Sequence, residues 1–136
     1  MKLPETYRIY SGKTFEVEFY VNPKGNVPAY DYYQLMDEDA KRRFFVILGH
    51  FADSPPGTIL PRSILNIEDK VVGIYAFKPA IHRFFSFFAI DRRVIILNAY
   101  QKQSQQMTRA DRNVLAAAVK MKNDYERRTK AGEYYE

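Results

Sequence analysis

The chain has 136 residues, of which 46% are hydrophobic and 15% aromatic, and it carries a formal net charge of +5. This size and composition fit one folded domain with one core, not a disordered chain. The absence of cysteine excludes disulfides, thiolate metal sites and cysteine nucleophiles. Residues 1–10 lack the apolar region of a signal peptide, and no apolar run reaches the roughly 18 residues of a membrane span. We therefore expect a cytoplasmic protein with no membrane partner.

The first half of the chain predicts a strand followed by two helices. In residues 14–21, TFEVEFYV, apolar residues alternate with Glu16 and Glu18, as in a half-buried strand. Residues 27–36 predict a short helix, and residues 37–51 predict a longer one. Acidic residues begin the longer helix, as its dipole favours, and its apolar residues keep the spacing of one buried face.

The second half predicts consecutive strands. Residues 63–67 and 71–78 are strand material around a charged turn. Residues 81–90 and 93–101 predict a central hairpin, because their apolar residues fall on both faces. Short turns between these strands favour antiparallel pairing.

A helix is predicted to begin after Thr108, which forms a capping-box pattern with Asp111. Arg109 and Arg112 lie outside the apolar face of this helix. The tail, residues 127–136, has mixed charge and is expected to fray.

The predicted order β–α–α–β–β–β–α indicates an α+β fold. We expect a small, antiparallel-rich sheet packed by two N-terminal helices, with a C-terminal helix at its edge or on its opposite face. Residues 1–136 are predicted to form one domain. Within it, residues 1–13 form an N-terminal extension, and both this extension and the tail are expected to be peripheral.

The basic excess lies in the half that contains the hairpin. Residues 1–70 carry 9 Lys and Arg against 10 Asp and Glu, whereas residues 71–136 carry 12 against 6, a net charge of +6. Such asymmetry indicates a polyanion, with nucleic acid preferred to membrane, or an acidic protein partner. A solvated basic surface explains the charge alone equally well.

The sequence contains none of the P-loop, GxGxxG, GxSxG or HExxH motifs. His50 and His82 are too few and too far apart for a zinc site, so we predict no metal and no cofactor. Carboxylates are sparse in the second half, which argues against a glycosidase pair or a two-metal nuclease.

The remaining candidates for chemistry are cationic and aromatic. Arg83 shares its predicted face with Phe85 and Phe87, and an arginine there is costly unless it is paired or faces an anion. A carboxylate of an early helix, such as Asp37 or Asp39, and a phosphate are equally good partners for it. Strand alternation places His82 on the opposite face, where a hydrogen-bonded histidine is the simpler interpretation.

Lys78, Tyr100 and Lys102 lie at the ends of strands that should be neighbours. Packing explains Tyr100 alone, and solvent exposure explains Lys102 alone. Together with Arg83 they fit a metal-free ribonuclease, because RNA supplies its own nucleophile, the 2′-OH. Lys and Arg can then stabilise the charge that builds on phosphorus.

Three segments, FEVEFY, RFFSFF and IILNAYQKQSQQMTRAD, together resemble the phage-derived HigB-like toxins of the RelE/ParE superfamily. Arg83 matches the arginine of the family's YRIFYFF-like strand, and Lys102 matches the first lysine of its LLHGFxKK strand. Ser104-Gln105 matches the link into the helix. The second lysine of that strand is Gln103 here, and Lys78 stands where the family usually has arginine.

The resemblance implies the toxin of a type II toxin–antitoxin system, an endoribonuclease that cuts mRNA on the ribosome without a metal. It also implies a cognate antitoxin protein that masks the basic surface. His82 or Tyr100 would transfer protons or stack on a base. The predicted catalytic residues are Arg83, Lys102 and His82, and the predicted RNA contacts are Lys78, Tyr100, Arg109 and Arg112.

Two alternatives stay open. The chain could be a non-catalytic interaction module, either a gyrase-directed toxin or a degenerate phage-derived relative, and Gln103 favours this alternative. It could also be a plain nucleic-acid-binding regulator, with sequence-tolerant binding and a steep dependence on salt.

Overall fold

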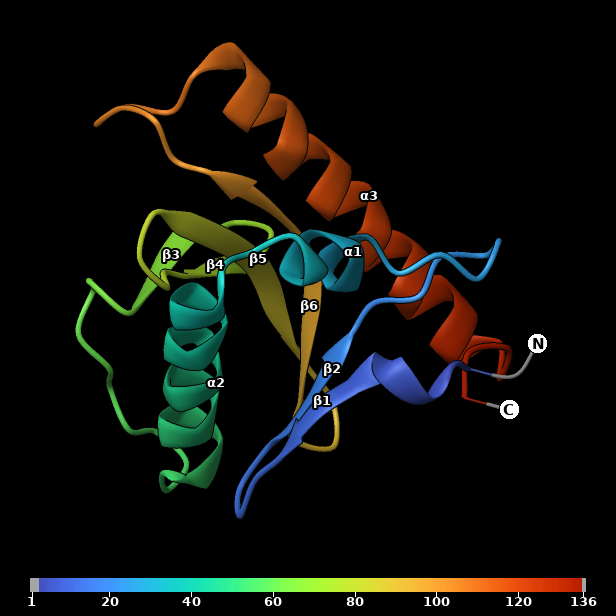
Figure 1. Ribbon diagram of the computed structural model, residues 1–136. Helices are drawn as coiled ribbons and strands as arrows, with labels where there is room; N and C mark the ends of the chain where they lie inside the picture. The colour runs from blue at the N-terminus through green and yellow to red at the C-terminus, as the bar shows by residue number, and fades with distance from the viewer. Residues whose placement is uncertain (1–2, 136) are drawn as a thin grey trace.

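The computed structural model describes residues 3–135 and shows a mixed β-sheet with helices on both of its faces (Figure 1). Within these residues the sheet has six strands in the order β1-β2-β6-β5-β4-β3. β2 and β6 pair in parallel, and the other neighbouring strands pair antiparallel. The strands are β1 (Arg8–Ser11), β2 (Glu16–Phe19), β3 (Leu65–Asp69), β4 (Ile74–Phe77), β5 (His82–Ala89) and β6 (Arg93–Gln101), and the α-helices are α1 (Pro28–Gln34), α2 (Glu38–Asp53) and α3 (Arg109–Lys130).

The predicted α+β class and the C-terminal helix are confirmed. The two strands predicted within residues 63–78 are present as β3 and β4, so this stretch adds one strand to the predicted order. The strand β1 was not predicted, and it lies inside residues 1–13, which we expected to be peripheral. In the described part of the chain, no helix has the length and apolar character that a membrane crossing requires.

Several contacts fix the N-terminal segment against the end of α2. The hydroxyl of Tyr10 donates to Asp53 Oδ2 at 2.7 Å, and the amide of Lys13 donates to Oδ1 at 2.9 Å. A Cβ at Gly12 would lie 2.5 Å from the carbonyl oxygen of Ala52, so a larger residue would force the two segments apart. The segment therefore packs as an edge of the sheet.

The β5–β6 hairpin forms where the sequence predicts it. Its turn residues, Asp91 and Arg92, both adopt left-handed conformations with φ of 61° and 55°. Such a turn matches the twist of the two strands it joins. The register places Arg83 opposite Tyr100 and His82 opposite Gln101.

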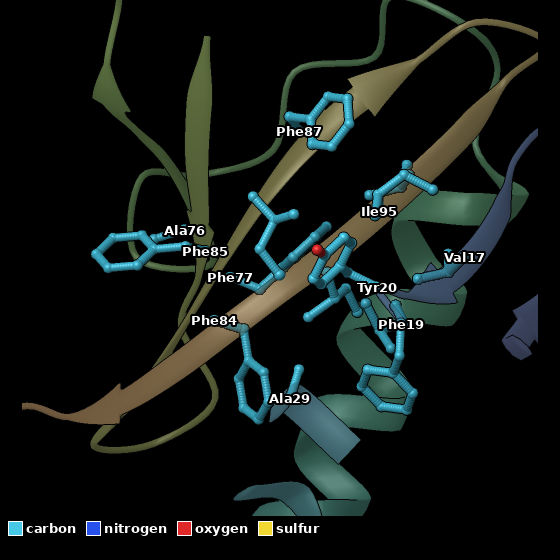
Figure 2. Packing of buried hydrophobic residues seen from close by; sticks show 14 of the residues in the cluster. Val17, Phe19, Tyr20, Ala29, Ala76, Phe77, Phe84, Phe85, Phe87 and Ile95 are labelled. Carbon is cyan, nitrogen blue, oxygen red and sulfur yellow. The ribbon is translucent and has the colours of Figure 1, made fainter. Parts of the chain in front are cut away.

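The core lies on both faces of β5 and β6. Phe84 stacks on Phe44 of α2 with ring centroids 4.0 Å apart, whereas Phe87 packs edge-on against Tyr125 of α3 at 5.4 Å. Figure 2 shows Phe84 and Phe87 pointing to opposite sides of the strand. The helices α1 and α2 therefore cover one face, the α2 face, and α3 covers the other, the α3 face.

The C-terminal tail packs on the body, contrary to the expected fraying and peripheral position. α3 continues to Lys130, and Tyr134 beyond it is 1% exposed. The amide of Val21 donates to the Tyr134 hydroxyl at 2.8 Å. The hydroxyl of Tyr135 donates to Glu18 at 2.6 Å, so the face of β2 that was expected to be exposed is covered.

Candidate functional site

Cationic side chains gather where the ends of β4, β5 and β6 meet. We call Arg62, Lys78, Arg83 and Lys102 the cation cluster. The charges of the three arginine and lysine neighbours lower the pKa of Lys78 in addition to burial, which is the largest cause, while Glu68 acts in the opposite direction. Because charges affect each other's pKa only at short range, these groups share one local field.

Backbone pairing brings these cations together. The amide of Lys78, just after β4, donates to the carbonyl of Ile64 at 2.9 Å. The amide of Lys102, just after β6, donates to the carbonyl of Ile81 at 2.7 Å, beside the start of β5. Arg83 is the second residue of β5. Antiparallel order thus places the end of one strand beside the start of the next.

Arg83 is held by carbonyl groups alone. Its Nη1 donates to the carbonyls of Ala80 and His82, both at 2.9 Å. Within residues 3–135 its Nε is buried without a hydrogen-bond partner, and no carboxylate forms an ion pair with it. Since no carboxylate neutralises the guanidinium among these residues, Arg83 keeps its positive charge available for an anion.

The early helix does not supply the carboxylate that was considered for Arg83. The side chain of Asp37 caps α2 by accepting from the amide of Ala40 at 2.8 Å. Asp39 pairs with Arg42 at 2.6 Å. Both carboxylates are therefore used within α2.

Tyr100 lies beside Arg83 on the α3 face. It is 8% exposed, and its ring packs against Phe85 with centroids 5.4 Å apart. Burial raises its pKa, and the charges of Glu68 and Asp111 raise it further. The hydroxyl is therefore protonated at neutral pH and can donate a hydrogen bond.

Sequence reasoning missed two members of this region, Arg62 and Glu68. The sequence indicates an exposed turn at Glu68, but β3 extends through it to Asp69. The amide of Asn66 lies 3.5 Å from the Glu68 carboxylate, on the same strand. Asn66 and Glu68 are two positions apart, which is the spacing of polar residues on one face of a strand. This spacing is the signal that could have extended the predicted strand to Glu68.

His82 lies across the sheet from the Arg83 side chain. Its Nδ1 is 2.6 Å from the hydroxyl of Tyr32 in α1, and the two rings pack edge to face. Burial lowers the pKa of His82, which favours the neutral ring. The structure therefore does not bring His82 together with Arg83 and Lys102 on one face.

Arg109 and Arg112 lie exposed at the start of α3. Arg112 Nη1 donates to the carbonyl of Met107 at 3.0 Å. Between them, Asp111 completes the predicted capping box with Thr108. Since Asp111 acts on the pKa of Tyr100, the start of α3 borders the site.

Among residues 3–135, no three His, Cys, Asp or Glu side chains are grouped so that they could hold a metal ion. A scan against protein-family models and a search of curated proteins found no match for this chain. A function must therefore be inferred from the chemistry of the site.

Proposed function

We propose that the protein is the toxin of a type II toxin–antitoxin system, with a RelE-like fold, and that it acts as a metal-independent endoribonuclease on ribosome-bound mRNA. The observation that carries this proposal is the cation cluster, and above all Arg83, which forms no ion pair with a carboxylate within the described residues. The mixed sheet, with two helices before its consecutive strands and one after them, is compatible with such a toxin.

The cluster fits the requirements of RNA cleavage. The 2′-OH of the substrate attacks the adjacent phosphorus, and negative charge builds on the phosphoryl oxygens. Arg83 and Lys102 would stabilise this charge through fixed cationic donors, as oxyanion sites do. Such binding of phosphates is driven by cations and falls with salt.

Lys78 and Tyr100 would complete the site. The lowered pKa of Lys78 brings its amine closer to neutral pH, which suits proton transfer better than an ordinary lysine. The protonated Tyr100 hydroxyl would donate a hydrogen bond to the phosphate or the leaving oxygen. His82 is left out of this set because it lies on the α2 face with Tyr32.

The test is primer extension on a translated message, comparing the wild type with the double variant Arg83→Ala, Lys102→Ala. The wild type is expected to produce new RNA ends that the double variant reduces by about 100-fold or more, the loss typical of removing transition-state charge stabilisation. A matched control is Lys24→Ala, Lys130→Ala, which removes the same charge from exposed positions outside the cluster. Identical cleavage by the wild type and the Arg83, Lys102 variant would refute the assignment.

One second function is favoured by particular residues. Gln103, exposed beside Lys102, supplies no charge where the resembling family has a second lysine, and His82 is sequestered. Both features fit a non-catalytic module that binds its partner without cutting RNA. Growth arrest without new RNA ends, with inhibition of DNA supercoiling in a gyrase assay, would select the gyrase-directed form.

A further inference from the structure

A concave surface lies on the α2 face, across the sheet from Arg83 and Tyr100. It is a pocket of ≈ 670 Å³ between the end of α2, strands β3–β5 and the loop at 54–64. Four aromatic rings form a connected wall. Phe15 stacks on Phe51 at 4.8 Å, Phe51 on Phe88 at 5.5 Å, and Tyr75 on Phe88 at 4.5 Å. We call it the aromatic pocket.

The loop that closes the aromatic pocket is fixed by its own contacts. Thr58 bonds to the carbonyl of Pro55 through both its amide (3.2 Å) and its hydroxyl (2.7 Å). Leu60 is buried, whereas Ile59, at the mouth, is 92% exposed. Loops positioned by a rigid scaffold in this way commonly carry binding residues.

The charged residues that line the aromatic pocket are cationic. Arg62 and Lys70 line it, and no Asp or Glu is among its described lining residues. Of the three nearest carboxylates along the chain, Glu68 acts on Lys78 in the cation cluster, and the other two are used elsewhere. Asp53 accepts from Tyr10, and Asp69 accepts from the amides that follow it in the β3–β4 turn.

We propose that the aromatic pocket binds a small amphiphilic anion, an aliphatic or aryl carboxylate whose apolar body lies against the rings and whose charge meets Lys70 and Arg62. The volume falls within the range of small-molecule sites, and such sites combine apolar walls with a few polar groups. Arg62 belongs both to this pocket and to the cation cluster, whereas the aromatic wall and Lys70 lie outside the proposed RNA site.

The test uses two dyes that differ by one charge, 8-anilinonaphthalene-1-sulfonate and the neutral N-phenyl-1-naphthylamine. Fluorescence titration of the full chain is expected to show one saturable site for the anionic dye, with decanoate displacing it. Lys70→Gln should weaken binding of the anionic dye about threefold, as expected for one exposed charge pair, and leave the neutral dye unchanged. Lys24→Gln, an exposed lysine in a distant turn, should change neither.

A second pair of variants tests the walls. Phe88→Ala should weaken both dyes about tenfold, because it removes a ring that contacts the apolar body. Val71→Ala is the matched control, since Val71 is 97% exposed and does not line the pocket.

Decanoate should shift the amide NMR signals of residues 54–62 and 70 in the wild type. The proposal would be overturned if Lys70→Gln and Lys24→Gln changed binding of the anionic dye equally, or if decanoate shifted only amide signals outside residues 54–62 and 70. It would also be overturned if neither dye nor decanoate bound and only a protein segment did.

Discussion

At the scale of single residues, Glu18 is the carboxylate in the most unusual setting. It is 2% exposed, receives a hydrogen bond from Tyr135, and lies 3.5 Å from Nε of Arg93. Burial raises the pKa of Glu18 more than Tyr135 and Arg93 lower it. Alternation in the sequence correctly assigns the strand but places Glu18 outward, because the residue that covers it lies far along the chain.

Glu18→Gln should change how stability depends on pH. Since the pKa of Glu18 is raised in the folded protein, the folded state holds this proton at higher pH than the unfolded state. Its contribution is fully present below the unfolded pKa of about 4.3 and is lost as pH rises through the folded pKa. The free energy of unfolding of the variant minus that of the wild type should therefore increase from pH 4 to pH 7 in urea titrations. A difference that stays constant over this range would contradict the assignment.

At the scale of elements, the hairpin and α3 could be predicted from sequence because their signals are local. β6 spans Arg93–Gln101 as predicted, and Thr108 caps α3 as predicted. β1 could not be predicted in this way, because four residues at an edge depend on pairing with β2 and on the fit of Gly12 against α2.

The candidate site likewise contains residues that local sequence patterns reveal and residues that only strand pairing brings in. Arg83 and Lys102 belong to the hairpin, so sequence patterns find both. Arg62 and Glu68 join them only because β3 pairs with β4 at the far edge of the sheet. The alternation within β5 also predicts correctly that His82 and Arg83 lie on opposite faces, although the partner of His82, Tyr32, comes from α1.

The packing of α2 on the sheet predicts a large effect of Phe44→Ala. Phe44 is fully buried and stacks on Phe84. Removing this ring leaves a cavity and should lower the free energy of unfolding by about 3–5 kcal/mol. Val46→Ala, two residues along the same helix and 65% exposed, should change it by no more than about 0.5 kcal/mol. Similar losses for the two variants in chemical denaturation would show that α2 does not pack as described.

At the scale of the whole molecule, one sheet separates two kinds of surface. The α3 face carries Arg83 and Tyr100 at the end where the cation cluster forms, and the α2 face carries the aromatic pocket. The basic half of the chain folds so that like charges meet at one sheet end. Such a concentration of charge costs stability when no anion is bound.

This cost predicts that Lys78→Gln stabilises the free protein. The pKa of Lys78 is lowered in the folded state by burial and by its cationic neighbours, so its charged form is disfavoured there. The variant should gain less than about 1 kcal/mol in 20 mM salt, because solvent screens a partly exposed group. The gain should shrink in 0.5 M salt, because salt shortens the range over which exposed charges repel each other.

Thermal unfolding with and without a short single-stranded RNA extends this measurement. A polyanion that binds the cluster should stabilise the wild type more than Lys78→Gln, which reverses the order found without RNA. Binding should weaken with salt, with a logarithmic slope that falls by about 0.7 for each phosphate contact removed. The exposed variant Lys24→Gln should keep the wild-type order and slope. If RNA stabilises wild type and Lys78→Gln equally at both salt concentrations, the cluster does not bind phosphate.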